Sequence, residues 1–205
     1  NSFLGAIDMV GLVMVSAGIM VANILAPRRK DDRALAIPGL FINMAFGTFV
    51  EAAYPFMFSK NIYVDGLESD AKYVFQYCEN VEVHNAKITT KDSFWECNNV
   101  TVYDSELDGE YLAWHSKNIK LVRCHISGEQ PLCYMDHITL VDCTFDPACD
   151  RAFEDCSNID ADIKGAITNV KNPISGRIVA DEIGSVTYTE FAKGHECEII
   201  KRGDK

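Results

Sequence analysis

Hydrophobic and polar positions repeat in this chain with a period of nineteen residues. An asparagine marks most repeats, a histidine marks one, and the last step is two residues longer: Asn61, Asn80, Asn99, Asn118, His137 and Asn158. Apolar residues follow one and three places after each marker, as Ile62 and Val64 follow Asn61. This alternation is typical of a β-strand with one buried face. A fixed period of this length indicates similar structural units that stack on their neighbours.

Each repeat also contains a second alternating stretch, with Ala86 and Ile88 and their equivalents at its inward positions. Two further columns precede each next marker. The column five places before it contains Phe75, Phe94, Ala113, Leu132 and Phe153. The column two places before it contains Cys78, Cys97, Ser116, Met135 and Cys156. Short strands and polar corners in a unit of this size predict a right-handed, single-stranded parallel β-helix, with coils about 4.8 Å apart. Leucine-rich repeats fit less well, because the unit has no Leu-rich consensus.

The asparagine column has a structural explanation in a β-helix. Amides stacked at a corner can hydrogen-bond to one another and to the backbone of the turn. We therefore interpret the column as structural rather than catalytic. The register is lost from residue 165, so the pattern predicts about five coils over residues 60–164, followed by C-terminal strands, a cap and a polar tail over residues 165–205.

The first 59 residues have a different pattern, with two long apolar segments. Residues 3–26 contain one charged residue, Asp8, and a helix of this length would reach about 36 Å, enough to cross a bilayer. Residues 34–58 form the second segment. The loop between them, residues 27–33, is rich in Arg and Lys, which places it on the cytoplasmic side. We therefore predict a pair of membrane segments that precedes the β-helix.

Glu51 decides how the second segment would lie in the membrane. A carboxylate at mid-membrane costs about 3 kcal/mol, so Glu51 favours a polar cavity or a re-entrant hairpin. The alternative is that Glu51 lies near the far interface and reaches the headgroups. A re-entrant segment would leave the β-helix in the cytoplasm, whereas two complete crossings would place it outside. Since the sequence begins at Asn1, we also expect this chain to be a fragment of a longer protein.

Charge and cysteine content limit the partners and the compartment. The net charge of −11 falls entirely on residues 60–205, and such an acidic surface disfavours nucleic acid. Cysteines one coil apart have poor geometry for a disulfide, so the eight cysteines are expected to be free and buried. Free thiols favour a reducing compartment, and hence a cytoplasmic β-helix. The spacing of His and Cys residues suggests no metal site, and we expect no cofactor.

A column of charged residues on one solvent face is the first candidate for chemistry. It contains Lys72, Lys91, Glu110 and Glu129, one coil apart. The simpler interpretation is a ladder of ion pairs that stabilises neighbouring coils modestly. The catalytic interpretation is that Glu110 and Glu129 form a close carboxylate pair whose pKa values diverge, with Lys91 beside them.

Aromatic residues just before the asparagine column form the second candidate. Trp95 and Trp114 lie one coil apart, near Tyr77, His115 and Tyr134. Stacked tryptophans with polar neighbours can bind sugar rings, whose C–H faces pack on aromatic planes. The alternative is a hydrophobic corner that packs under a loop or against another chain. We therefore predict a ligand-binding face for a carbohydrate or a protein partner.

Several segments resemble a bacterial family of unknown function: Tyr73–Val81, Asp92–Cys97, Gly109–His115 and Gln130–Tyr134. The resemblance covers residues 61–192, and the family is similar to pectate-lyase-type right-handed β-helices. It implies a fold and a bacterial source, but no activity and no catalytic residues. Members of the family have further coils where this chain has its apolar segments.

Residues 1–59 are similar to enzyme IIC, the membrane subunit of a sugar phosphotransferase system. The similarity rests on Ala36–Asn43 and Gly47–Glu51, and it implies that Glu51 contacts sugar hydroxyls in a re-entrant loop. Ala52 stands where these permeases have a proline, and two segments alone cannot transport a sugar.

Three functions remain open from the sequence. The first is a binding or scaffold module attached to a membrane segment, and the second is a polysaccharide lyase or hydrolase that uses Glu110 and Glu129. The third is a permease fragment joined to an unrelated, truncated β-helix near residues 59–61, where the composition changes.

Overall fold

The computed structural model describes residues 14, 17–26, 36–37, 40–41 and 56–203. The chain divides into two compact units, Asn1–Pro55 and Phe56–Lys205. The described residues of the first unit are almost all helical. Across the described parts of the chain, no helix has the length and apolar character needed to span a membrane. The predicted membrane segments, residues 3–26 and 34–58, therefore receive no support, and Glu51 lies outside the described residues.

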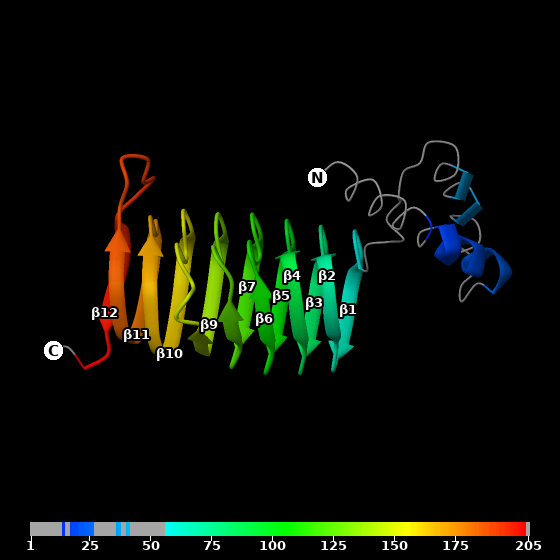
Figure 1. Cartoon of the computed structure of the whole chain (residues 1–205). Coiled ribbons are helices and arrows are strands. Elements are labelled where there is room, and N and C mark those ends of the chain that lie inside the picture. Colours follow the sequence, from blue (N-terminus) through cyan, green and yellow to red (C-terminus); the bar gives the residue numbers. More distant parts are fainter. Residues whose placement is uncertain (1–13, 15–16, 27–35, 38–39, 42–55, 204–205) are drawn as a thin grey trace, which may run out of the picture. The chain divides into compact units, whose positions relative to one another are not determined.

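The second unit contains twelve strands among its described residues. They are β1 (Lys60–Asp65), β2 (Glu68–Val74), β3 (Glu79–His84), β4 (Lys87–Ser93), β5 (Asn98–Tyr103), β6 (Glu106–Gly109), β7 (Lys117–Val122), β8 (His125–Ser127), β9 (Asp136–Phe145), β10 (Ser157–Lys171), β11 (Ser175–Thr187) and β12 (Glu196–Lys201). Figure 1 shows them side by side as successive coils of one solenoid.

The coils pair in parallel along two faces. One face contains β1, β3, β5, β7 and β9 in that order, and the other contains β2, β4, β6, β8 and the end of β9. The long strands β10 and β11 pair with each other on both sides of a register shift. Because each strand bonds to the strand one coil away, the fold needs no contact between distant parts of the sequence. The predicted parallel β-helix is confirmed.

The predicted number of coils, five, is wrong, because the solenoid has about seven turns. Residues beyond 164, which we expected as a cap, continue the stack through β11 and β12. The nineteen-residue period fails there because the spacing between equivalent strands changes and residues 188–195 form a longer loop between β11 and β12. Strand pairing tolerates insertions in the turns, and between β10 and β11 it also tolerates a register shift within the strands.

The asparagine column forms the predicted amide ladder. Asn80 Nδ2 donates to Asn61 Oδ1 at 2.9 Å, and Asn99 Nδ2 donates to Asn80 Oδ1 at 2.7 Å. All six marker residues have a left-handed backbone, with φ between 54° and 59°. Asparagine tolerates this region better than most residues, so the column places a bend at the same point of every coil. Asn118 departs from the ladder, because its Nδ2 donates to Asn98.

Aromatic and apolar columns fill the interior. The rings of Phe56, Phe75 and Phe94 stack with centroids 4.8 and 5.0 Å apart, and Phe75 and Phe94 are fully buried. Truncating a buried phenylalanine costs about 3–5 kcal/mol, so this column stabilises the stack substantially. Phe56 belongs to this column, although the sequence pattern assigned it to the second membrane segment.

All eight cysteines are free and buried, as predicted. The Cys97 thiol donates to the Phe75 carbonyl at 2.8 Å, and it accepts from the Cys78 N–H at 3.3 Å. Burial raises the pKa of Cys133 to about 12 and that of Cys149 to about 11. These thiols therefore stay protonated at neutral pH and act as small core residues.

Candidate functional site

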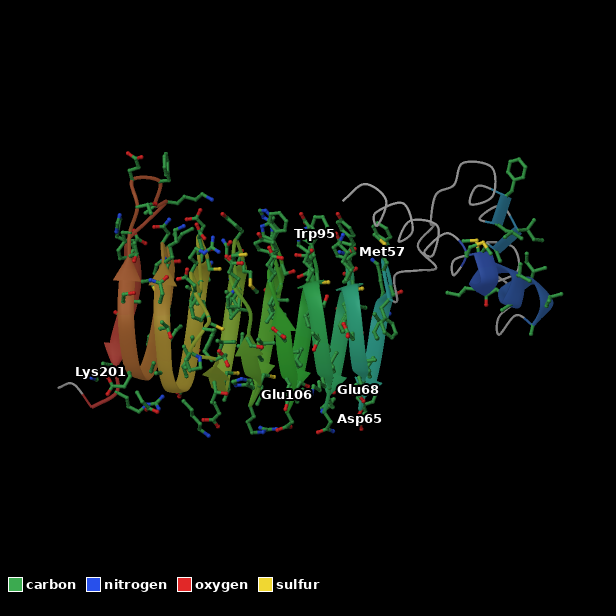
Figure 2. All side chains as sticks on the ribbon, in the orientation of Figure 1. Met57, Asp65, Glu68, Trp95, Glu106 and Lys201 are labelled. Atoms are coloured by element: carbon green, nitrogen blue, oxygen red, sulfur yellow. The ribbon has the colours of Figure 1, made fainter. Side chains whose placement is uncertain are left out.

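One corner of the solenoid connects the second strand of each coil to the first strand of the next. We term it the aromatic corner, and it consists of residues 56–58, 73–77, 92–96, 111–115, 130–134 and 151–155. Figure 2 shows Met57 and Trp95 at this edge, opposite Asp65, Glu68 and Glu106. Two left-handed residues make each sharp turn, as Phe94 and Glu96 do with φ of 56° and 53°. The residue between them is therefore held at the turn, where Trp95 and Trp114 lie.

The structure brings all five predicted binding residues together in this corner. The Trp95 and Trp114 rings stack with centroids 5.6 Å apart and planes inclined by 17°. Tyr77 lies 5.7 Å from Trp95 on one side. On the other side, His115 stacks between Trp114 and Tyr134 at 5.2 and 5.3 Å. The five residues thus form a continuous ladder along the solenoid axis.

The ladder meets a charged loop residue at its far end. Lys193, from the loop between β11 and β12 that projects from the stack in Figure 1, lies 5.6 Å from the Tyr134 ring centroid. Its Nζ also lies 3.3 Å from Asp155 Oδ2. The loop therefore reaches back to the aromatic corner and adds a cation to it.

Stacking changes what the tryptophans offer to a ligand. Trp114 packs against Trp95, Tyr111, His115 and Tyr134, so neighbouring rings occupy its faces. A sugar ring packs on an open aromatic face, and the neighbouring rings leave little open face on Trp114. This geometry supports the alternative interpretation, in which the corner packs against a loop or a partner chain, more than it supports a sugar platform.

Unpartnered polar atoms gather in the same corner. Within the described residues, seven buried side-chain polar atoms have no hydrogen-bond partner, and all seven lie there: Gln76 Nε2, Asp92 Oδ1, Ser93 Oγ, Trp95 Nε1, Trp114 Nε1, Arg151 Nε and Asp155 Oδ1. Such an atom costs about 1–3 kcal/mol, and most buried polar groups are paired. Folding stability alone does not account for this concentration.

Asp92 is a functional candidate that the sequence reasoning missed. The residue is 5% exposed, and burial raises the pKa of its carboxyl group, while Lys91 lowers this pKa and Glu110 raises it. The signal in the sequence was a carboxylate at a strand position where the neighbouring coils have Tyr73 and Tyr111. Buried carboxylates with perturbed pKa values are common at functional sites.

Glu154 is also buried in the corner, but its carboxylate is satisfied. Lys171 Nζ lies 2.8 Å from Glu154 Oε1, and Gln130 Nε2 donates to Glu154 Oε2. Of the buried residues Asp92 and Glu154, only Asp92 has a carboxylate oxygen without a hydrogen-bond partner, and the half-buried Asp155 has another at Oδ1.

The predicted catalytic column consists of ion pairs in the structure. Lys91 Nζ lies 3.7 Å from Glu110 Oε2, and Arg151 Nη2 lies 2.7 Å from Glu129 Oε1. Each candidate carboxylate therefore has its own cation, as the charge-ladder interpretation expects. Lys91 also lies 5.7 Å from the Tyr111 ring centroid. In the part of the chain that the structure describes, no three His, Cys, Asp or Glu side chains are arranged to hold a metal ion.

A hollow of about 380 Å³ lies over the outer side of β1, β3 and β5. Its lining residues come from three neighbouring coils: Asn61, Ile62, Tyr63, Asn80, Val81, Glu82, Asn99 and Thr101. The sequence reasoning identified the asparagines as structural and did not predict this hollow.

The fold and its corners define a parallel β-solenoid protein with free, buried thiols. A family model described as a protein of unknown function, DUF3737, matches residues 42–200, and the chain belongs to this family. No curated protein and no solved structure matches the chain. The predicted relationship to a family of unknown function is confirmed, whereas the comparisons give no support to the resemblances to pectate lyases and to enzyme IIC.

Proposed function

We propose that the solenoid is a binding module that recognises a protein partner through the aromatic corner. One observation carries this proposal: the stacked aromatic ladder and all seven unpartnered buried polar atoms of the described residues occupy the same corner. Tryptophan and tyrosine are enriched where protein partners bind most strongly. A second chain whose binding rearranges these side chains can provide hydrogen-bond partners for the polar atoms that folding leaves unpaired.

The charge of the surface indicates the chemistry of the partner. Glu96 is exposed beside the ladder, and residues 60–205 carry the entire net charge of −11. Opposite charge steers partners together and suppresses wrong ones. We therefore infer a partner segment that contains Lys or Arg together with aromatic or aliphatic side chains.

The chain contains two tryptophans, and both lie in the aromatic corner, so intrinsic fluorescence reports on this surface. The experiment is a selection from a library of Lys/Arg-rich peptides, followed by titration of the selected peptide with fluorescence detection. We expect the emission to change on saturation, and we expect the double variant Trp95→Ala, Trp114→Ala to bind the labelled peptide at least tenfold more weakly by anisotropy. Failure to select any peptide, or unchanged affinity in the double variant, would contradict the proposal. A response to neutral oligosaccharides that the double variant loses would assign the corner to carbohydrate instead.

A polysaccharide lyase or hydrolase is the second candidate, and Asp92 is the observation that favours it. Its buried carboxyl group has a raised pKa and lies near Glu110, and a general acid has this character. The test is the release of reducing or unsaturated ends from a panel of acidic and neutral polysaccharides. Activity that is lost in both Asp92→Asn and Glu110→Gln would establish this function, and no release across the panel would count against it.

The location of the protein is a separate proposal. The eight free thiols support a reducing, cytoplasmic environment for the solenoid, and attachment to a bacterial membrane through residues 3–58 remains the proposal from the apolar pattern. Fractionation of cells that express the chain, with protease added from either side of the membrane, tests both points. The proposed fusion of a permease fragment near residues 59–61 has less support, because the family match runs without a break from residue 42 to residue 200.

A further inference from the structure

The hollow over β1, β3 and β5 is lined by a regular row of amides. Asn61, Asn80 and Asn99 contribute one side chain from each of three successive coils. Asn80 donates one hydrogen bond and accepts one within the ladder. A side-chain amide has two N–H donors and two acceptor lone pairs, so Asn80 retains one of each for a ligand. The row therefore offers a donor and an acceptor at every coil, about 4.8 Å apart.

A carboxylate and an aromatic ring accompany the amides. The Glu82 Oε1 atom lies 2.7 Å from His84 Nε2, which fixes the direction of the carboxylate. The His84 ring stacks on Tyr103 with centroids 4.6 Å apart and tilts against Tyr63 at 5.5 Å. This network holds Glu82 at the hollow, while Tyr63 remains 65% exposed. The site thus has a positioned acceptor, a row of amides and an accessible ring.

The charge and spacing of these groups select among ligands. Glu82 and the acidic surface disfavour uronates, sulfates and phosphates. An extended peptide presents groups on one side about every 6.6–6.8 Å, which does not keep register with amides about 4.8 Å apart. Apolar ligands would leave the amides and Glu82 without hydrogen-bond partners. Hydroxyl groups both donate and accept, so neighbouring hydroxyls of a sugar match an amide and a carboxylate side by side.

We propose that this hollow is a binding site for a neutral oligosaccharide that lies along the solenoid axis across three coils. The asparagines and Glu82 bond to its hydroxyls, and the exposed ring of Tyr63 packs on a C–H face of one sugar. Thr101 adds a further hydroxyl at the edge of the hollow. This site is independent of the aromatic corner, and neither Trp95 nor Trp114 lines it.

The test is isothermal titration calorimetry of the whole chain with cello-, manno- and xylo-oligosaccharides, and with oligogalacturonate as the anionic comparison. We expect at least one neutral series to bind and oligogalacturonate to bind at least tenfold more weakly. Tyr63→Ala and Glu82→Gln should each weaken the neutral ligand at least tenfold. Asn80→Gly provides a third variant, because glycine accepts the left-handed backbone while removing the amide.

Matched controls remove the same kinds of side chain elsewhere on the solenoid. Tyr188→Ala deletes a tyrosine whose ring is tilted against His195, and Glu106→Gln neutralises a carboxylate at another corner. Both controls should bind the oligosaccharide as the wild type does. Absence of neutral binding, a preference for oligogalacturonate, or unchanged affinity in Tyr63→Ala and Glu82→Gln would each overturn the proposal. Loss of binding confined to the double variant Trp95→Ala, Trp114→Ala, with its circular dichroism unchanged from the wild type, would also overturn it, because that result would move the sugar to the aromatic corner.

Discussion

Trp95 and Trp114 stack on each other across one coil, with ring centroids 5.6 Å apart and planes inclined by 17°. Each tryptophan therefore has one face covered by the other ring. The two tryptophans differ in the number of rings that they contact. Trp114 contacts four rings, whereas Trp95 contacts two, those of Trp114 and Tyr77.

Trp114→Ala should destabilise the solenoid more than Trp95→Ala. Each ring pair contributes about 0.5–1.5 kcal/mol beyond the buried area, so we expect Trp114→Ala to cost about 2–4 kcal/mol and Trp95→Ala about 1–2 kcal/mol. Urea unfolding followed by circular dichroism measures both values. Equal losses would show that ring contacts do not determine the stability of this corner.

Asp92→Asn should stabilise the protein at neutral pH. Burial raises the folded pKa of Asp92 above its ordinary value of 3.8, so the folded state favours the protonated carboxyl group. Its contribution is fully present below pH 3.8 and is lost as the pH rises through the higher folded pKa. The variant should therefore exceed the wild type by about 1 kcal/mol at neutral pH, and the difference should shrink toward acidic pH. Unfolding midpoints measured across this range test the sign, and a difference that does not change with pH would contradict it.

The buried thiols should make the solenoid sensitive to alkaline pH. Burial raises the folded pKa of Cys133 to about 12 and that of Cys149 to about 11, above the ordinary value of 9.0. A raised folded pKa gives stability that is present below pH 9.0 and declines as the pH rises toward these values. We expect the urea midpoint to fall above pH 9, and Cys149→Ala should reduce this slope. A midpoint that stays constant between pH 8 and pH 10.5 in the wild type would refute the assignment.

Asn80 should tolerate glycine better than alanine. Its φ of 57° is left-handed, and its amide links two coils. Glycine loses the hydrogen bonds, at about 1 kcal/mol, whereas alanine adds strain of about 1–2 kcal/mol. Thermal unfolding of Asn80→Gly and Asn80→Ala provides the comparison. If alanine were the less disruptive of the two, the left-handed bend would not be the reason for the asparagine column.

The sequence pattern was sufficient to predict the repeated part of the fold. Apolar residues alternate with polar ones around Ile62 and Val64, and the asparagines recur with the same period. Residues one period apart pair between neighbouring strands in the structure, as Ile62 and Val81 do. The last coils were missed because the paired residues at β11 and β12 depart from the nineteen-residue spacing, as Ile159↔Gly176 and Ser175↔Glu196 show, and because β10 and β11 pair across a register shift. The place of Phe56 in the core was missed for another reason. It lies at the end of a long apolar segment, which the pattern assigned to the membrane, although its ring stacks on Phe75.

The candidate sites were predicted only in part. Periodicity placed Tyr77, Trp95 and Trp114 together, but it could not show that stacking occupies the ring faces. Asp92 was missed because the linear pattern does not show that its carboxylate is buried, although it occupies the strand position that holds Tyr73 in the preceding coil. The hollow at Tyr63 and Glu82 depends on three-dimensional shape, which a linear pattern does not contain.

The most direct test of the aromatic corner as a protein-binding surface is a comparison of two charge reversals. Glu96 is exposed beside Trp95, whereas Glu106 lies at the opposite edge of the stack (Figure 2). Affinity for the selected basic peptide should fall at least tenfold in Glu96→Lys and remain unchanged in Glu106→Lys. Equal effects of the two substitutions would mean that the peptide responds to net charge alone, and the aromatic corner would not be its binding site.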